Sequence, residues 1–535
     1  MSDCNRPDVS PRRSSRVSRS GRSLWWRCCL GGLALSVVVG VSHAGEAEKR
    51  DSDPLPEGAI ARLRGTGVPV SLSVSPDATK VAAACNDGTL RVWDCKTGTV
   101  LLEHRAGGMP AKAMALCDEG KAVAWINKHW RDGGAVIALS GKTVRRLIPA
   151  DERVVQTAIF SLDGSTLATS GFVTGIRLWS TSTGKQLANL GVADGLATAM
   201  SISRDNALLA TAAHSNTAGG HLLEVWRIAT GESLLCPKRG GEEIASLAFS
   251  PDGKYLAAGA QGVEIYELAT GKMANGFGQT SSIQLLAFSP NGRMLAYRVA
   301  NRLHFHDLIA GRHSEGIPAA QMTVTAFAFS EDGRCIATGG ADGTILLWAA
   351  PNPQGGPPTP LTANQLDALW QDLAAANAAA GYRALRGLVA AGGPAVALLK
   401  DRLKPSQPPE PGLLDRLIVQ LDSENWSERE TASGRLAKLG EAARLALRRA
   451  LEETKSAEVK WRVRALLNAL ASPLSAPPEA LRDGRALTVL ELMGTDEAEA
   501  ALAALADVGV GRLGADARAS LNRLRRAGHD SHRPQ

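Results

Sequence analysis

One four-residue pattern recurs seven times along the chain and restricts the folds open to it. Each copy resembles Ser-Pro-Asp-Gly and follows a short run of apolar or small residues; the copies begin at residues 75, 117, 161, 203, 250, 289 and 330. Successive copies are 42, 44, 42, 47, 39 and 41 residues apart. A period of about 40 residues accommodates four short strands and their turns. We therefore expect an all-β, seven-bladed propeller in which each copy marks one blade.

Two further markers keep the register of this turn. A large side chain closes the third expected strand of six blades, and the second blade is degenerate around residues 136–137; the six are Trp93, Trp179, Trp226, Tyr266, Phe305 and Trp348. A turn ending in glycine follows that strand in the first six blades, at Gly98, Gly141, Gly184, Gly231, Gly271 and Gly311. Between the second and third strands, Asp87-Gly88 and Asp342-Gly343 predict two-residue hairpin turns.

The seventh blade has no fourth strand of its own. Trp348 is followed directly by Ala-Ala-Pro-Asn-Pro, and proline lacks the N–H group that a strand ladder needs. Upstream of the first repeat, Ala59–Leu63 has the length of a strand and no partner nearby in the sequence. We expect this segment to become the outer strand of blade seven, which closes the ring and removes an exposed edge.

The repeats resemble those of the WD40 family. Residues 87–94 (DGTLRVWD) and 342–348 (DGTILLW) are similar to the closing half of a WD40 repeat, and Phe-Ser-Pro-Asp-Gly at 249–253 is a turn common in bacterial members. The resemblance covers residues 59–350 and implies a propeller that binds proteins. The family's Gly-His pair before the first strand is missing, so Asp87 and Asp342 are expected to form turns. The markers of the repeat are Asp87, Trp93, Asp94, Trp179, Trp226, Tyr266, Phe305, Asp342 and Trp348.

The composition changes after a Pro- and Gly-rich linker at residues 351–361. Residues 362–528 are rich in Ala, Leu and Arg, with helical spacing of apolar side chains. Thr362 with Gln365, and Ser427 with Glu430, form capping-box patterns that predict helix starts. Short connections between the expected helices favour a HEAT-like right-handed stack, with an irregular helical bundle as the alternative. Residues 529–535 are expected to be a disordered tail.

The first 44 residues have the pattern of a secretory signal peptide. An Arg-rich segment precedes the apolar run Cys28–Val41, and Ser42-His43-Ala44 has the small residues of a cleavage site. An uncleaved membrane anchor is the alternative. We expect the mature chain to begin with a linker at residues 45–58 and to reside in the periplasm or cell envelope, or to be secreted. Removing seven Arg, Asp3 and Asp8 reduces the formal charge from +7 to +2, so a general basic character does not predict nucleic-acid binding.

The cysteines do not indicate a metal site or a disulfide framework. Five would remain after cleavage, an odd number, and no Cys-x-x-Cys occurs; they are Cys85, Cys95, Cys117, Cys236 and Cys335. A hairpin at Asp87-Gly88 would place Cys85 opposite Leu90 and Cys95 opposite Lys80. We expect small buried thiols that do not meet.

Motifs for catalysis are missing from the sequence. It has no GxxxxGK[ST] phosphate loop, no Gly-x-Ser-x-Gly elbow and no His-Glu-x-x-His. His304 and His306 would lie on one face of a strand in blade six, but no third metal ligand is visible, and a structural or solvent-facing pair is favoured. Asn425-Trp426-Ser427 fits the N-glycosylation pattern, yet its context favours helix capping. We therefore expect no enzyme, no cofactor and no bound metal.

Two longer loops between second and third strands are the candidate binding surfaces. They span residues 127–134 in blade two and 213–221 in blade four, and the residues expected to contact a protein partner are His129, Trp130, Arg131, His214 and Asn216. Trp and Arg are frequent interface anchors. The alternative is that Trp130 folds back over blade two.

The predicted function is a non-catalytic scaffold for protein partners. Two alternatives stay open. A propeller hydrolase or lyase acting on an extracellular polymer would require several carboxylates, or His with a carboxylate, at the channel mouth. A structural cell-envelope protein would have no discrete partner.

Overall fold

The structure is a computed structural model that describes most of residues 54–528. The described ranges are 54–65, 67–105, 111–117, 120–127, 134–139, 143–146, 155–171, 175–190, 195–215, 220–235, 243–278, 282–300, 302–315, 323–350, 360–404, 410, 412–471, 477–508 and 512–528. The expected signal peptide, linkers and tail at residues 1–44, 351–359 and 529–535 lie outside them, as do residues 45–53.

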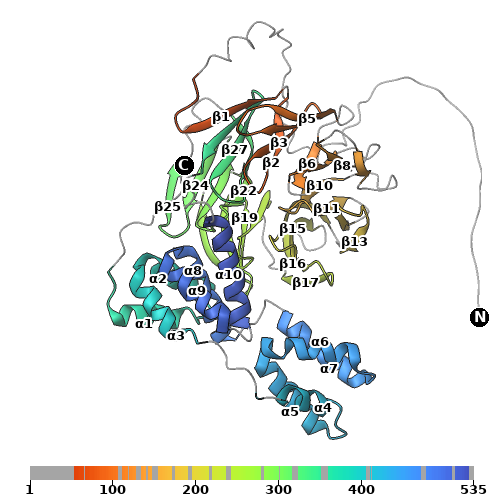
Figure 1. The fold of residues 1–535 in the computed structure, drawn as a ribbon, viewed down its shortest axis with the longest axis vertical. Coiled ribbons are helices and arrows are strands. Elements are labelled where there is room, and N and C mark those ends of the chain that lie inside the picture. Colours follow the sequence, from red (N-terminus) through yellow and green to blue (C-terminus); the bar gives the residue numbers. More distant parts are fainter. Residues whose placement is uncertain are drawn as a thin grey trace, which may run out of the picture. The chain divides into compact units, whose positions relative to one another are not determined.

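The described strands form seven antiparallel four-stranded sheets, as the repeats predict (Figure 1). Blade one contains β2 (Pro69–Val74), β3 (Lys80–Cys85), β4 (Thr89–Asp94) and β5 (Val100–Arg105). Blade two contains β6 (Ala111–Cys117), β7 (Ala122–Asn127), β8 (Gly134–Ala138) and β9 (Thr143–Arg146). Blade three contains β10 (Thr157–Phe160), β11 (Thr166–Gly171), β12 (Gly175–Ser180) and β13 (Gln186–Asn189). Blade four contains β14 (Gly195–Ile202), β15 (Leu208–Ser215), β16 (Gly220–Arg227) and β17 (Glu232–Leu235).

The remaining three blades complete the propeller. Blade five contains β18 (Ser246–Phe249), β19 (Tyr255–Gly259), β20 (Gly262–Glu267) and β21 (Lys272–Gly278). Blade six contains β22 (Ile283–Phe288), β23 (Met294–Val299), β24 (Arg302–Asp307) and β25 (Arg312–Glu315). Blade seven contains β26 (Val324–Phe329), β27 (Cys335–Gly340), β28 (Thr344–Ala349) and β1 (Ala59–Arg64).

Strand β1 closes the ring, and this prediction from the sequence is confirmed. It pairs antiparallel with β28, with Leu63 opposite Ile345 and Arg64 opposite Thr344. The register shifts between Ala59 and Ala61, and Ile60 at this irregularity is exposed. Leu63 is buried in a core that blades seven and one share. The N-terminal segment therefore supplies both the missing fourth strand of blade seven and part of the apolar packing between blades seven and one.

Six of the seven repeat turns are held by their own side chains; the turn of blade two lies partly outside the described residues. In blade five the Ser250 hydroxyl donates to Asp252 Oδ1 at 2.5 Å, while the N–H of Tyr255 donates to Ser250 Oγ at 2.9 Å. The same arrangement recurs at Ser75, Ser161, Ser203, Ser289 and Ser330, with Asn291 replacing the acid in blade six. The recurring acids therefore stabilise turns, as expected.

The large residue of each third strand is buried. All six side chains are at most 8% exposed. Three of them donate a hydrogen bond from the indole N–H to a threonine hydroxyl on the second strand of the same blade: Trp179 to Thr169, Trp226 to Thr211, and Trp348 to Thr338. Asp87 and Asp342 accept from the N–H of Thr89 and Thr344, so both are turn formers, as predicted.

The expected two-residue hairpin turns are wrong by one residue. Ala84 is opposite Leu90, so the loop comprises residues 86–88. The N–H of Gly88 donates to the Cys85 carbonyl at 3.1 Å, and Gly88 has a φ of 80°. A turn followed by a left-handed glycine is the usual three-residue hairpin. Gly343, with a φ of 82°, ends an equivalent loop.

The corrected register leaves the thiols apart. Cys85 lies at the end of β3, whereas Asp94, not Cys95, is opposite Lys80. No disulfide joins the described cysteines, which are Cys85, Cys95, Cys117 and Cys335. Cys236 lies outside the described residues.

Ten α-helices are described after the propeller, in the region that the sequence predicts to be helical. They are α1 (Ala363–Asp372), α2 (Ala378–Ala391), α3 (Gly393–Arg402), α4 (Leu413–Gln420), α5 (Trp426–Leu439), α6 (Arg444–Glu453), α7 (Ala457–Ala471), α8 (Pro478–Met493), α9 (Asp496–Val508) and α10 (Arg512–Gly528), with a 3₁₀ turn η3 (Gly440–Ala443) before α6.

The two capping predictions differ in outcome. Thr362 and Gln365 form the expected capping box of α1. The box predicted at Ser427 is wrong, because α5 begins one residue earlier and Asn425 Oδ1 accepts from the Ser427 N–H at 2.9 Å. Asn425 therefore serves as a cap, which was the preferred reading of its glycosylation-like pattern.

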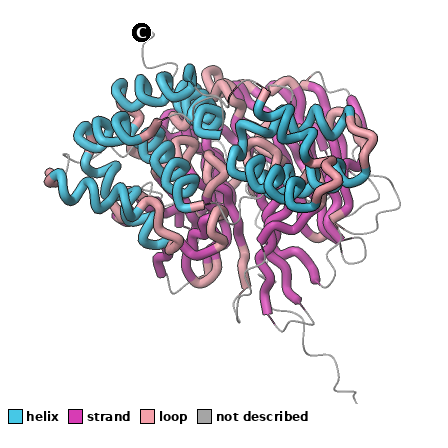
Figure 2. Tube along the Cα trace, turned by 90° about the horizontal axis from the view of Figure 1, so that it is seen from below, coloured by secondary structure: helices cyan, strands magenta, loops and turns pink. Residues whose placement is uncertain are grey.

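The helices form two groups (Figure 2). Helices α1–α3 and α8–α10 share one apolar core with blades five and six, and α2 packs directly on α8. Helices α4–α7, which lie between them in the sequence, enclose a separate core around Leu417, Leu436 and Leu447. We name α4–α7 the four-helix unit. The helices therefore do not pack in sequence order, because the first three and the last three share a core while the four between them form a separate one.

We looked for helices that could cross a lipid bilayer. Within the described ranges, no helix combines the required length and apolar character.

The closure of the ring makes a testable prediction. Leu63→Ala should lower the free energy of unfolding by about 2–5 kcal/mol, because it leaves a cavity at the joint between blades seven and one. Ile60→Ala, on the same strand but 54% exposed, should change it by less than about 0.5 kcal/mol. Calorimetric unfolding of both variants provides the measurement. Equal effects would contradict the assigned packing of β1.

Candidate interaction sites

The central channel of the propeller forms a cavity in the described structure. It has a volume of about 510 Å³ and is lined by the innermost strand of every blade. The second residues of several repeat turns lie at one mouth: Leu162, Arg204, Pro251, Pro290 and Glu331. Across this mouth, Arg204 Nη2 of blade four donates to Glu331 Oε1 of blade seven at 2.5 Å. The two charged groups thus connect distant parts of the ring.

The described lining of the channel does not contain the cluster of carboxylates, or of His with a carboxylate, that the hydrolase alternative requires. Among its described lining residues, Arg204 and Glu331 are the only charged ones, and they neutralise each other. No group of three or more His, Cys, Asp or Glu in the described parts of the chain is placed to hold a metal ion. Glu331 therefore lacks the second carboxylate that acid–base hydrolysis would use.

The predicted partner-binding residues fall largely outside the described ranges. His129, Trp130, Arg131 and Asn216 all do so. The expected bounds of the blade-four loop, 213–221, are wrong, because β15 continues to Ser215 and β16 begins at Gly220. His214 is therefore a strand residue near the end of β15; it is exposed and lies opposite His221 of β16, with ring centroids 5.0 Å apart. Because the other four cannot be placed, the expected surface stays a prediction.

A buried ion pair joins the propeller to the helices. Arg485 of α8 donates from Nε and Nη2 to the two carboxylate oxygens of Glu267, at the end of β20, at 2.7 and 2.6 Å. Their side chains are only 3% and 4% exposed. Arg485 Nη1 also donates to the carbonyl oxygens of Leu373 and Ala375, which follow α1. Burial opposes the charge on Arg485, but its bonds with Glu267 outweigh this and raise its pKa.

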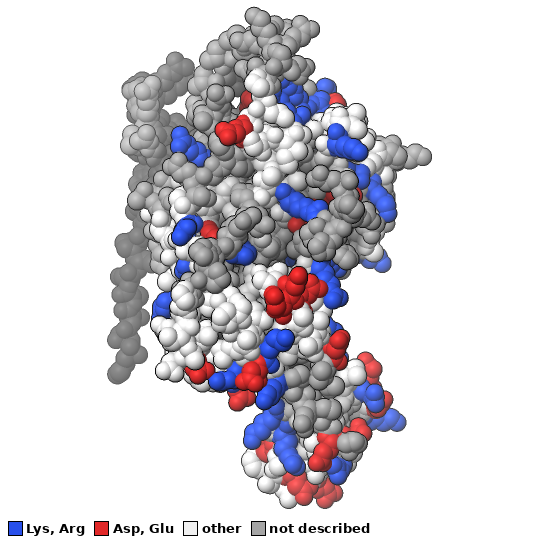
Figure 3. Space-filling view, turned by 60° about the vertical axis from the view of Figure 1, so that its left-hand side comes forward, with Lys and Arg blue, Asp and Glu red and all other residues white. Residues whose placement is uncertain are grey.

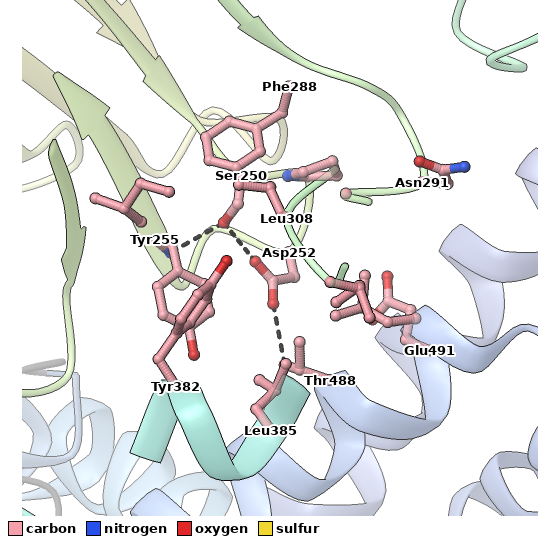
Figure 4. A pocket seen from close by; sticks show the side chains of 15 residues that line it. Ser250, Asp252, Tyr255, Phe288, Asn291, Leu308, Tyr382, Leu385, Thr488 and Glu491 are labelled. Atoms are coloured by element: carbon pink, nitrogen blue, oxygen red, sulfur yellow. Dashed lines mark hydrogen bonds between the residues drawn. The ribbon is translucent and has the colours of Figure 1, made fainter. Parts of the chain in front are cut away.

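A second polar contact joins α8 to blade five. Lys254 Nζ donates to the Gly484 carbonyl at 2.7 Å and to Thr488 Oγ1 at 2.8 Å. Thr488 in turn donates to Asp252 Oδ2 at 3.1 Å (Figure 4). Burial alone would raise the pKa of Asp252, but Lys254 and Arg523, together with hydrogen bonds, hold it below its ordinary value. The Asp252 carboxylate therefore stabilises its own turn and also accepts a hydrogen bond from α8.

Aromatic packing completes the junction around a small cavity. Tyr255 and Tyr382 are both buried and meet edge to face, with ring centroids 5.5 Å apart. Arg386 of α2 donates to the Ile309 carbonyl at 2.8 Å. The cavity between these elements measures about 30 Å³, which is room for about one or two water molecules. Such a volume fits structural water and excludes a drug-sized ligand.

The sequence of α8 contains a pattern that indicates a buried charged contact at this junction. In α8, Leu481, Arg485 and Thr488 follow one another at helical spacing on a buried face. A lone arginine on such a face requires a carboxylate partner. The partner, Glu267, lies 218 residues away and could not be identified from spacing alone.

Blade six contains a stack of aromatic and histidine rings. His306 of β24 stacks on Phe277 of blade five with ring centroids 3.9 Å apart, and His304 stacks on Tyr297 at 5.6 Å. His306 is 7% exposed, and its Nδ1 has no hydrogen-bond partner in the described structure. Burial, then His313 and Arg386, lower its pKa to about 4, and the charge of Asp307 opposes this only in part. His306 is therefore packed inside the fold, while His304 is half-buried.

Comparison with known families supports the repeat assignment. Residues 59–94, 236–262 and 315–349 match the family described as WD domain, G-beta repeat. The chain contains WD40 repeats. The first matched segment runs from β1 to β4, so a WD40 repeat in the sequence takes its first strand from blade seven and its other strands from blade one.

Three relatives are similar to part of this chain at low identity. Telomerase protein component 1 of Mus musculus is 23% identical over 26% of this chain and 5% of its own length. Periodic tryptophan protein 2 of Saccharomyces cerevisiae is 24% identical over 53% of this chain and 28% of its own length. Guanine nucleotide-binding protein subunit beta of Arabidopsis thaliana is 23% identical over 53% of this chain and 81% of its own length. The chain thus spans less than a third of the first two relatives.

The buried ion pair gives a prediction for the attachment of the helices to the WD40 propeller. Arg485→Met should cost about 3–5 kcal/mol in the free energy of unfolding, because it leaves Glu267 charged and buried. Combining it with Glu267→Leu should restore most of that loss. Arg525→Met is the matched control, since Arg525 and Glu499 form an exposed pair worth at most about 1 kcal/mol. Urea unfolding at neutral pH measures all three. A double variant as unstable as Arg485→Met would contradict the pairing.

The position of His306 predicts a pH dependence. Its folded-state pKa of about 4 lies below the ordinary 6.5, so the neutral ring contributes stability above pH 6.5 that is lost as the pH falls toward 4. The full shift corresponds to roughly 3 kcal/mol, and solvent screening should reduce this to about 1–2 kcal/mol. His306→Phe should remove that part of the acid destabilisation while keeping the stack on Phe277. Thermal unfolding of both proteins across this range tests it, and parallel profiles would contradict it.

Proposed function

We propose that this protein is a non-catalytic platform that binds other proteins. The observation that carries the proposal is the structural use of its charged groups: repeat acids cap turns, Arg204 pairs with Glu331, and Glu267 pairs with Arg485. A closed propeller presents a rigid surface at little entropic cost on binding. One relative is by its printed name a subunit, and so part of a larger assembly.

We further propose that the platform works outside the cytoplasm, in the periplasm or cell envelope or after secretion. The support is the Arg-rich segment, apolar run and Ser42-His43-Ala44 of the first 44 residues. The paired packing of α6 with α7 and of α4 with α5 supports HEAT-like repeats within the four-helix unit. Such repeats provide extended surfaces for partners.

Capture of partners tests the platform function. The tagged full chain, cross-linked in the cell envelope and purified, should recover the same partners in repeated experiments. A variant lacking Ala59–Leu63 should lose those partners that require the closed ring, because blade seven then lacks its outer strand. Recovery of no reproducible partner would contradict the platform and support the structural-protein alternative.

Export makes a separate prediction. The mature chain should begin near Gly45 and fractionate outside the cytoplasm. Ala44→Trp should block cleavage, because the cleavage position requires a small residue. Determining the N-terminus of each fractionated protein measures this. A full-length protein in the cytoplasm would contradict export while leaving the binding function open.

A further inference from the structure

The most exposed apolar side chains in the described structure belong to the four-helix unit. Val419, Trp426, Leu445 and Trp461 are between 65% and 73% exposed, whereas the exposed large apolar residues elsewhere in the described ranges reach at most 55%. Two of the four are tryptophans. Tryptophan is enriched among residues that anchor interfaces. Large apolar side chains with this exposure, on a unit of four short helices, indicate a surface that binds a partner.

The two tryptophans flank one network of ion pairs. Arg462 of α7 donates to Glu430 and Ser433 of α5 at 2.8 and 3.1 Å, and to Glu458 of α7 at 2.7 Å. Trp426 lies one turn before Glu430 on α5, and Trp461 is next to Arg462 on α7. The network therefore places both rings on neighbouring parts of one surface, which we name the α5–α7 surface.

Within this network the positive charges are covered and the negative ones face water. The side chains of Arg462 and Arg429 are 7% and 21% exposed, whereas those of Glu430 and Glu458 are 47% and 45% exposed. The outward-facing charges of the network itself are therefore carboxylates, whereas exposed Arg464 and half-buried Lys460 lie within one turn of Trp461 on α7.

Further carboxylates surround Trp426. Asp422, Glu424 and Glu428 are exposed in the turn before α5 and in its first turn. Asp422 accepts from the Ser456 hydroxyl at 2.6 Å, which brings the starts of α5 and α7 together. Lys455 is the exposed basic residue of the adjoining α6–α7 turn. Figure 3 shows acidic side chains at the lower end of this unit.

We propose that the α5–α7 surface binds a Lys- or Arg-rich segment of a partner protein. The inference deepens the proposed platform function by assigning it a surface and a class of partner. A cation stacks favourably on the face of tryptophan, and Arg462 already lies 5.8 Å from the Trp461 ring centroid. A basic segment can extend this arrangement by stacking on the open ring faces while its charges meet the surrounding carboxylates.

Fluorescence anisotropy with the full chain tests the proposal directly. The probes are labelled short peptides in which serine alternates with arginine, with glutamine or with glutamate. The arginine peptide should bind and the other two should not. Replacing both tryptophans, Trp426→Leu with Trp461→Leu, should weaken binding about tenfold, because leucine keeps apolar area but has no aromatic face. Glu424→Gln with Glu428→Gln should weaken it several-fold and reduce its salt dependence.

Matched controls separate this surface from general effects. Leu445→Ala removes an equally exposed apolar side chain at the far end of the unit, and Glu497→Gln removes an exposed carboxylate of α9; neither should change binding. Unchanged affinity in the tryptophan double variant, or equal binding of the glutamate peptide, would overturn the proposal. Partners captured from the envelope would still be recovered in that case, so the platform function would survive it.

Discussion

The ladder between β1 and β28 is the interaction on which the propeller depends. Blade seven has three strands of its own, and the proline-rich continuation after Ala349 cannot supply the fourth. By pairing with β28, the N-terminal strand joins the two ends of the ring through backbone hydrogen bonds and buries Leu63 between blades seven and one. A closed ring also lets each blade cover the faces of its neighbours, which small side chains such as Ala82 and Ala83 can fill completely.

Once the ring is closed, charged residues mainly connect its parts. Arg204 and Glu331 link blades four and seven across the channel mouth, and Glu267 with Arg485 fixes α8 to blade five. A buried ion pair often adds less to stability than apolar packing of the same volume. Removing one partner is nevertheless strongly destabilising, because the other charge is left buried and unpaired. The Glu267–Arg485 pair therefore specifies where the helices attach, while Tyr255, Tyr382 and the shared apolar core supply the stabilisation.

The helical region contributes two physically different parts. Helices α1–α3 and α8–α10 extend the core of blades five and six, so their apolar faces are covered. The four-helix unit has its own core and keeps two tryptophans exposed beside outward-facing carboxylates. This contrast suits a division of labour in which one part braces the propeller and the other meets a partner. It also explains why an apparently uniform helical sequence need not form a single stack.

The sequence by itself determined the features set by local pattern. The repeat period predicts the seven turns and the buried residues at Trp179 and Trp348. The prolines after the last repeat predict the closing strand, and composition predicts the helical region that follows. Details that depend on competing local hydrogen bonds were missed: a left-handed Gly88 lengthened the hairpin loop, and Asn425 displaced Ser427 as the cap. Only the tertiary structure decided that α2 meets α8, that Arg485 finds Glu267, and that Trp426 and Trp461 flank one surface. Periodicity reveals which face of an element is apolar, but residues hundreds of positions apart are paired by the packing of the whole chain.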